Sequence, residues 1–279
     1  MTTSHLSPIS ISRALLIALP PVTASVMVLS IAGVSVSVWT MHAIAIALSL
    51  AIAVTGQRLR LGAVAVIALT VAAIAATLLF PLSGPRRWMV LGPVHLYMAP
   101  VVLPAFLAAL SIALPARTAL AFAAAIVIAA LLAAQPDASQ VLALVAGAAV
   151  VFAQDRARAR TAALTVAVMA LITAWAFTRP DPLLPVPWVE GVFALALGHS
   201  AIAGIVVIAC AVAFIASLAL ASSRGPRWIG AVAAYYAVLF ACSIAGLTPA
   251  PLIGFGAGPL LGFGLLVATA GSARAITER

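Results

Sequence analysis

The chain has 279 residues, of which 66% are hydrophobic and 7% are charged, and its mean hydropathy is +1.28. Soluble domains are ~45–50% apolar and ~25% charged, so this composition excludes a soluble globular protein, and the scarcity of charge excludes a disordered one. The formal net charge is +9, and all 14 basic residues are arginines. Because these arginines lie in short gaps between apolar runs, they indicate orientation in a bilayer and argue against nucleic-acid binding.

Ten apolar runs follow one another along the chain. A helix needs about 20 apolar residues to cross ~30 Å of hydrocarbon, and two of the runs are short enough to require a tilt or a thin bilayer. We therefore predict an all-α fold, a polytopic membrane helix bundle of about ten transmembrane helices, forming a single integral membrane domain over residues 1–279. The runs are 13–35, 38–56, 61–82, 94–114, 118–134, 138–153, 161–178, 192–221, 228–247 and 256–272.

The arginines predict the orientation of the bundle. With ten spans both termini lie on one side, and positively charged gaps are typical of the cytoplasmic side. The gaps on the opposite side hold three arginines: Arg86, Arg87 and Arg179. We therefore expect both termini in the cytoplasm. The 11 arginines on that side are Arg13, Arg58, Arg60, Arg117, Arg156, Arg158, Arg160, Arg224, Arg227, Arg274 and Arg279.

Two of the outer gaps contain candidate binding residues. Arg86 and Arg87 precede Trp88 in the first gap. Paired guanidinium groups could clamp a phosphate, because they present planar forks of donors, or they could anchor the chain at the membrane interface. Asp137, in the second gap, could cap the helix that follows it or take part in the site.

The third outer gap, residues 178–191, contains four prolines, Arg179 and Glu190. The prolines stiffen the loop and hold Glu190 near the membrane surface, where the next helix begins. Its carboxylate could act as a general base, or it could interact with the positive end of that helix. His199 lies about two turns further on, either hydrogen-bonded inside the bundle or available to a ligand.

The last outer gap, residues 248–259, is rich in glycine and proline. Broken helices of this kind occur in membranes where they pack against protein or line a cavity. We expect a groove bordered by residues 84–92, 178–191 and 248–259. The sequence contains no metal-ligand motif and predicts no metal site. No cofactor is evident, and the binding of a divalent cation such as Mg²⁺ is left as an open alternative. The spans also lack the rows of acids that are typical of cation-driven transporters.

Four segments in order resemble motifs of the SEDS family (shape, elongation, division and sporulation), the RodA/FtsW-type peptidoglycan polymerases. Residues 84–92 resemble the family's G-A-R-R-W-I-x-L-G, and residues 135–139 resemble Q-P-D-L-G. Residues 188–194 fall where the family has H-T-D-F-I-F-A, and residues 249–256 resemble P-L-P-F-I-S-Y-G. The resemblance extends over nearly the whole chain, and it identifies a shortened and divergent relative.

The resemblance implies a site and leaves its activity open. The family's catalytic Asp falls at Glu190, which would deprotonate a sugar hydroxyl, while Arg86, Arg87 or Arg179 would neutralise the pyrophosphate. Trp88, Asp137 and His199 complete the expected substrate-binding set. However, the family's Q-P-S-E-x-x-K is replaced by residues 97–103, so that an acid and a lysine are missing, and the loop before Glu190 is short.

Three functions follow as hypotheses. The first is a lipid II-polymerising peptidoglycan glycosyltransferase of cell division or elongation in the bacterial inner (plasma) membrane. Its partners would be a polyprenyl-pyrophosphate-linked sugar, membrane lipids and a membrane-anchored transpeptidase, without nucleic acid. The second is a non-catalytic relative that binds a polyprenyl lipid or scaffolds a partner. The third, a small transporter or flippase, has little support from the apolar bundle interior.

Overall fold

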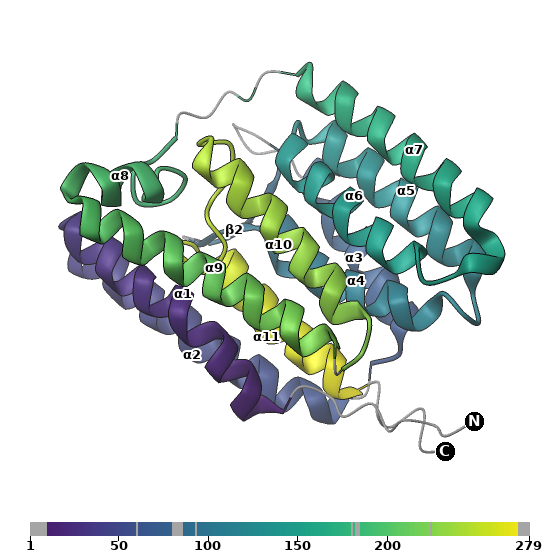
Figure 1. Cartoon of the computed structure of the whole chain (residues 1–279), viewed down its shortest axis with the longest axis horizontal. Helices are drawn as coiled ribbons and strands as arrows, with labels where there is room; N and C mark the ends of the chain where they lie inside the picture. Colours follow the sequence, from purple (N-terminus) through teal and green to yellow (C-terminus); the bar gives the residue numbers. More distant parts are fainter. Residues whose placement is uncertain are drawn as a thin grey trace.

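The computed structural model describes residues 10–59, 61–79, 86–92, 94–179, 181, 185–223 and 225–272, and it is an all-α membrane bundle, as the sequence predicts (Figure 1). One short hairpin interrupts the helices. In chain order the elements are α1 (Ile11–Ile31), α2 (Val36–Leu59), α3 (Ala63–Leu79), β1 (Trp88–Leu91), β2 (Val94–Tyr97), α4 (Met98–Ala113), α5 (Thr118–Ala134), α6 (Ala138–Phe152), η1 (Arg156–Arg158), α7 (Ala159–Phe177), α8 (Val192–His199), α9 (Ala201–Ser223), α10 (Trp228–Ile244) and α11 (Ala257–Ser272).

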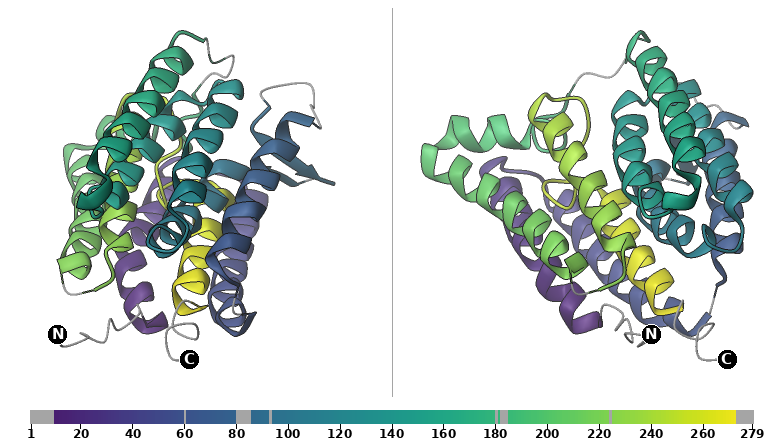
Figure 2. Two further views of the ribbon diagram at one scale, coloured as in Figure 1. Left: turned by 90° about the vertical axis from the view of Figure 1, so that its right-hand side faces the viewer. Right: turned by 45° about the vertical axis from the view of Figure 1, so that its right-hand side comes forward.

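The long helices run alternately up and down, so the bundle has two ends (Figures 1 and 2). We call the end where α1 begins and α11 finishes the terminal end. The opposite end, called the loop end, carries the hairpin, the α5–α6 turn and the segments on either side of α8 and before α11. Residues 178–191 are called the Pro-rich loop, and residues 248–259 the last loop. The arrangement brings the four outer gaps of the sequence to one end of the molecule.

Four of the described helices are long and apolar enough to cross a membrane: α1, α2, α9, and α7 together with η1. Six more apolar helices have 15 to 17 residues, which correspond to only about 22–26 Å of rise. These ten helices correspond to the ten predicted runs, and α8 is an additional short helix.

The predicted continuous run over residues 192–221 is wrong in one respect. Ser200 has an extended backbone (φ −165°, ψ 154°) and separates α8 from α9. The chain reverses there, and α8 packs on the first turns of α9, where a Cβ on Gly204 would lie 2.2 Å from Leu197 Cδ2 (Figure 2). Hydropathy does not reveal the break, because both helices are equally apolar on average.

The hairpin is a second departure from the sequence prediction, which placed residues 94–97 in a helix. Strands β1 and β2 pair in antiparallel register, with Trp88 opposite Tyr97 and Leu91 opposite Val94. Gly92 occupies the turn with φ +62°, a conformation that glycine adopts without steric cost. The hairpin fixes the backbone that carries Arg87 and Tyr97, and the Met98 N–H donates to the Arg87 carbonyl at 3.2 Å.

Helix α11 lies in the centre of the bundle and packs against α2 and α4. Its glycines permit this packing, because a Cβ on Gly262 would lie 1.9 Å from the Pro100 carbonyl oxygen, and one on Gly264 would lie 2.3 Å from that of Ser49. Small residues that let helix backbones approach closely are typical of membrane bundles. The loop before α11 is therefore held firmly against α4, next to the hairpin.

The arginine distribution predicts that the loop end faces the periplasm. An alkaline phosphatase fusion at Pro185 is expected to be active and a fluorescent protein fusion there dark, with the opposite pattern at Gly225 on the terminal end. Both sites lie in connections between helices. Fluorescence from the fusion at Pro185 would show that the loop end faces the cytoplasm, which contradicts the predicted orientation.

Candidate functional site

The last loop and the Pro-rich loop pack against each other at the loop end. The Phe255 N–H donates to the Trp188 carbonyl at 2.8 Å. Gly254, at φ +82°, sits so close that a Cβ there would lie 2.6 Å from the same carbonyl oxygen and 2.6 Å from Val192 Cγ1. The last loop thus rests directly on the turn that carries Glu190.

This contact predicts a large effect of Gly254→Ala. The substitution adds left-handed backbone strain to a steric clash and should cost about 3 kcal/mol of stability, measured by thermal unfolding in detergent. Gly92→Ala is the matched control, since Gly92 also has positive φ but a Cβ there meets nothing within 4 Å among the described residues. It should cost only about 1 kcal/mol. Equal losses for the two variants would show that the loop contact contributes nothing.

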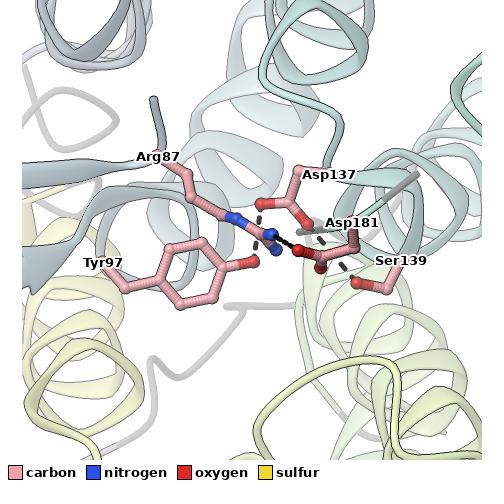
Figure 3. Close-up of polar contacts among 5 residues, drawn as sticks. All are labelled: Arg87, Tyr97, Asp137, Ser139 and Asp181. Carbon is pink, nitrogen blue, oxygen red and sulfur yellow. Dashed lines mark hydrogen bonds and ion pairs between the residues drawn. The ribbon is translucent and has the colours of Figure 1, made fainter. Parts of the chain in front are cut away.

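An ion pair joins the hairpin to the Pro-rich loop. The Arg87 guanidinium Nη2 donates to Asp181 Oδ1; the Arg87 side chain is 7% exposed and that of Asp181 is 39% exposed (Figure 3). Burial alone would lower the pKa of Arg87, but Asp137, the Tyr97 hydroxyl and Asp181 together raise it above its ordinary value. Arg87 is therefore a permanently charged link inside the site.

Asp137 lies beside Arg87 and is 1% exposed. The Tyr97 hydroxyl donates to its Oδ2 at 2.5 Å, and the Ser139 hydroxyl donates to Oδ1 at 3.4 Å (Figure 3). Burial raises the pKa of the carboxyl, and the charge of Arg87 and the Tyr97 hydroxyl partly offset that rise. Asp137 occupies the N-cap position of α6, where no side-chain capping bond forms within the described chain, although the Gln140 backbone N–H in the first turn also acts to lower the pKa of the carboxyl.

Polar side chains continue from Asp137 into the bundle. The Tyr235 hydroxyl donates to Gln140 Oε1 at 2.7 Å, and the Gln135 amide donates to Thr77 Oγ1 at 2.6 Å. The sequence reasoning missed Tyr97, Tyr235 and Gln140. A tyrosine inside an apolar run was the available indication, because a buried hydroxyl needs a hydrogen-bonding partner.

Glu190 is half-buried at the end of the Pro-rich loop. Its Oε2 accepts from the Val186 N–H at 2.9 Å, and the Val186 carbonyl accepts from the Glu190 N–H at 3.0 Å. Burial raises the pKa of Glu190, and the negative charge of Asp181 raises it further. The backbone N–H groups of Val186 and Glu190 and the positive charge of Arg87 lower the pKa and offset part of this rise. Glu190 is therefore electrostatically coupled to the ion pair, and its role as a base stays a prediction.

The other predicted residues differ in exposure. Arg86 and Arg179 are exposed, and the Arg179 guanidinium lies 5.1 Å from the centre of the Trp175 ring. The Trp88 and Tyr97 ring centres are 5.4 Å apart. His199 is exposed at the end of α8, so the expectation of a histidine buried in the bundle is wrong.

The described residues of the three segments expected to border a groove lie together; residues 84–85, 180 and 182–184 are outside the described part of the chain. Two hollows are nevertheless found elsewhere among the described residues. One of about 480 Å³ lies between α6 and α7, and one of about 210 Å³ lies between α1, α2 and α11 and reaches the last loop at Leu252. The described residues contain no group of three His, Cys, Asp or Glu that could hold a metal ion.

No model of a known protein family matches the chain, and no curated protein matches its sequence. A search of solved structures finds a chain in one described as "Structural coordination of polymerization and crosslinking by a peptidoglycan synthase complex". The similarity covers 94% of this chain and 97% of that chain, with a TM-score of 0.64 and 19% sequence identity. This similarity shows a shared fold, an all-α bundle of apolar helices.

Proposed function

We propose that the protein is a SEDS-like cell-envelope membrane protein that binds a polyprenyl-pyrophosphate-linked sugar, similar to lipid II, at the loop end of its bundle. The observation that carries the proposal is the convergence of the hairpin, the Pro-rich loop and the last loop on the Arg87–Asp137 cluster. The shared fold with a chain of a peptidoglycan synthase complex supports the same biological setting.

The exposed arginines are the proposed pyrophosphate ligands. Arg87 is buried and forms an ion pair with Asp181, so its positive charge is already balanced by an acid of the protein. Its neighbour Arg86 and the exposed Arg179, two residues before Asp181, are brought to the same region by that ion pair. Guanidinium groups bind phosphate oxygens through two parallel hydrogen bonds, which suits them to a pyrophosphate at the membrane surface.

Glu190 is the proposed general base. Its carboxylate would accept the proton of a sugar hydroxyl on one lipid-linked disaccharide. The resulting oxygen would attack the anomeric carbon of a second, and polyprenyl pyrophosphate would leave with the electron pair of the broken C–O bond. A carboxylate with a raised pKa is a stronger base at neutral pH, and Glu190 meets this requirement.

The second candidate is a non-catalytic relative that keeps the fold to bind a polyprenyl lipid or a membrane-anchored transpeptidase. The specific observation in its favour is the bond between Glu190 Oε2 and the Val186 N–H, which directs one carboxylate oxygen toward its own loop. The longer side chain, compared with the aspartate of the family, allows this contact.

Purified protein and fluorescent lipid II test both candidates, with and without a membrane-anchored transpeptidase. We expect lipid II binding that excess polyprenyl pyrophosphate displaces and that Arg86→Gln/Arg179→Gln weakens at least tenfold. Arg117→Gln/Arg227→Gln, at the terminal end, is the matched control and should bind as the wild type does. Glycan chains would establish the glycosyltransferase, and binding without chains would establish the second candidate. Failure to bind lipid II would overturn the proposal.

A further inference from the structure

The hollow between α1, α2 and α11 is an apolar cleft in the half of the bundle near the terminal end. It is lined on α1 from Ile11 to Val22 and on α2 from Ile46 to Ala53. Its polar wall residue, Ser49, donates its hydroxyl to the Leu260 carbonyl at 2.6 Å, so this hydroxyl is already satisfied. The cleft therefore presents hydrocarbon and suits an apolar chain.

The cleft is open at its side and closed at its upper end. Leu15 and Leu19 on its rim are 53% and 58% exposed, so in a bilayer they face lipid. Above it, on α1, the Ser25 hydroxyl donates to the Gly254 carbonyl at 2.7 Å, and His42 Nε2 lies 3.2 Å from Ser25 Oγ. This hydrogen-bonded layer joins α1, α2 and the last loop, and it limits how far an apolar chain can enter.

The length of the cleft matches one leaflet. From Ile11 to Val22 the helix rises about 16 Å, close to half of the ~30 Å hydrocarbon core. The volume of about 210 Å³ exceeds the ~150 Å³ of a cavity that holds benzene. The dimensions fit part of one acyl chain of a lipid in the leaflet at the terminal end.

The surroundings of the mouth favour a negative headgroup. The first turn of α1 contains no acidic residue; Ser10 Oγ accepts from the Arg13 N–H, and the positive end of the helix dipole lies at the level of the mouth. Arg13 near the start of α1 and Arg58 near the end of α2 are exposed at the same end of the bundle. Interfacial arginines attract anionic lipids. We infer that this cleft binds the acyl chain of an anionic phospholipid, whose phosphate lies at the α1 N-terminus between Arg13 and Arg58.

Delipidated protein titrated with phosphatidylglycerol, or with phosphatidylcholine of the same acyl chains, tests the inference by native mass spectrometry. We expect one tightly retained phosphatidylglycerol and at least fivefold weaker retention of phosphatidylcholine. Arg13→Gln/Arg58→Gln should abolish this preference, and Ala18→Trp, which fills the cleft, should abolish retention of both lipids. Ala163→Trp, in the hollow between α6 and α7, is the matched control and should retain phosphatidylglycerol.

Three results would overturn the inference: retention by folded Ala18→Trp equal to the wild type, an unchanged lipid preference in the double arginine variant, or a loss of retention in Ala163→Trp as well. Should Ala18→Trp fail to fold, phosphatidylglycerol with a photoreactive acyl chain replaces it. Labelling of α1, α2 and α11 in the wild type supports the cleft, and labelling only elsewhere contradicts it. None of these readouts uses lipid II, so they stand or fall separately from the proposed function.

Discussion

Replacing Glu190 with glutamine is expected to abolish any polymerisation of lipid-linked disaccharide, because the amide cannot accept the proton of the attacking hydroxyl. Loss of a general base typically lowers the rate by 10²–10⁴-fold. Glu190→Asp should retain or raise the rate, since it restores the side-chain length of the family and releases the bond to Val186. A displacement of about an ångström can change a rate by roughly 100-fold. The measurement is glycan chain formation from fluorescent lipid II.

The pH dependence provides a second test of Glu190. Only the deprotonated carboxylate acts as a base, so the rate should rise with pH through the raised pKa of Glu190. Lipid II binding should be unchanged in Glu190→Gln, which serves to separate chemistry from binding. Robust chain formation by Glu190→Gln would show that the base lies elsewhere, at Asp181 or Asp137. Inactivity of the wild type and Glu190→Asp alike, with binding intact, would favour the non-catalytic candidate.

Replacing Arg87 with methionine is expected to cause a large loss of stability at the site. The change removes the positive charge beside the buried carboxyl of Asp137 and breaks the link to Asp181. Removing one partner of a buried ion pair costs about 3–5 kcal/mol. Because Asp181 is 39% exposed, we expect the lower end, about 3 kcal/mol. This corresponds to a fall of roughly 10 °C in the unfolding midpoint in detergent.

Two variants isolate the origin of that loss. Asp137→Asn keeps an oxygen that can accept from the Tyr97 hydroxyl and leaves Arg87 paired with Asp181, so it should cost only about 1 kcal/mol. Asp181→Asn removes the more exposed acid and should also cost about 1 kcal/mol. An Arg87→Met variant as stable as these two would show that the buried charge does not hold the hairpin in place.

Local sequence determined the membrane bundle, because a bilayer accepts only chain segments that satisfy their own backbone hydrogen bonds. Apolar runs of the right length therefore had to be helices, and nine of the ten predicted runs contain one uninterrupted helix. The run over residues 192–221 failed because the segments on either side of Ser200 are similarly apolar, so their average hydropathy does not reveal the break. The residues before Met98 form a strand because they pair with β1, a partner that hydropathy does not reveal.

The site was only partly determined by the sequence. The motifs drew attention to Arg87, Asp137 and Glu190, since charged residues beside a membrane are rare. The tertiary structure decided their environments. It buried Arg87 against an acid 94 residues away, and it gave Asp137 the Tyr97 hydroxyl as a hydrogen-bonding partner. Burial and hydrogen bonding set the charge of such groups, and both depend on segments that meet only when the whole bundle is packed.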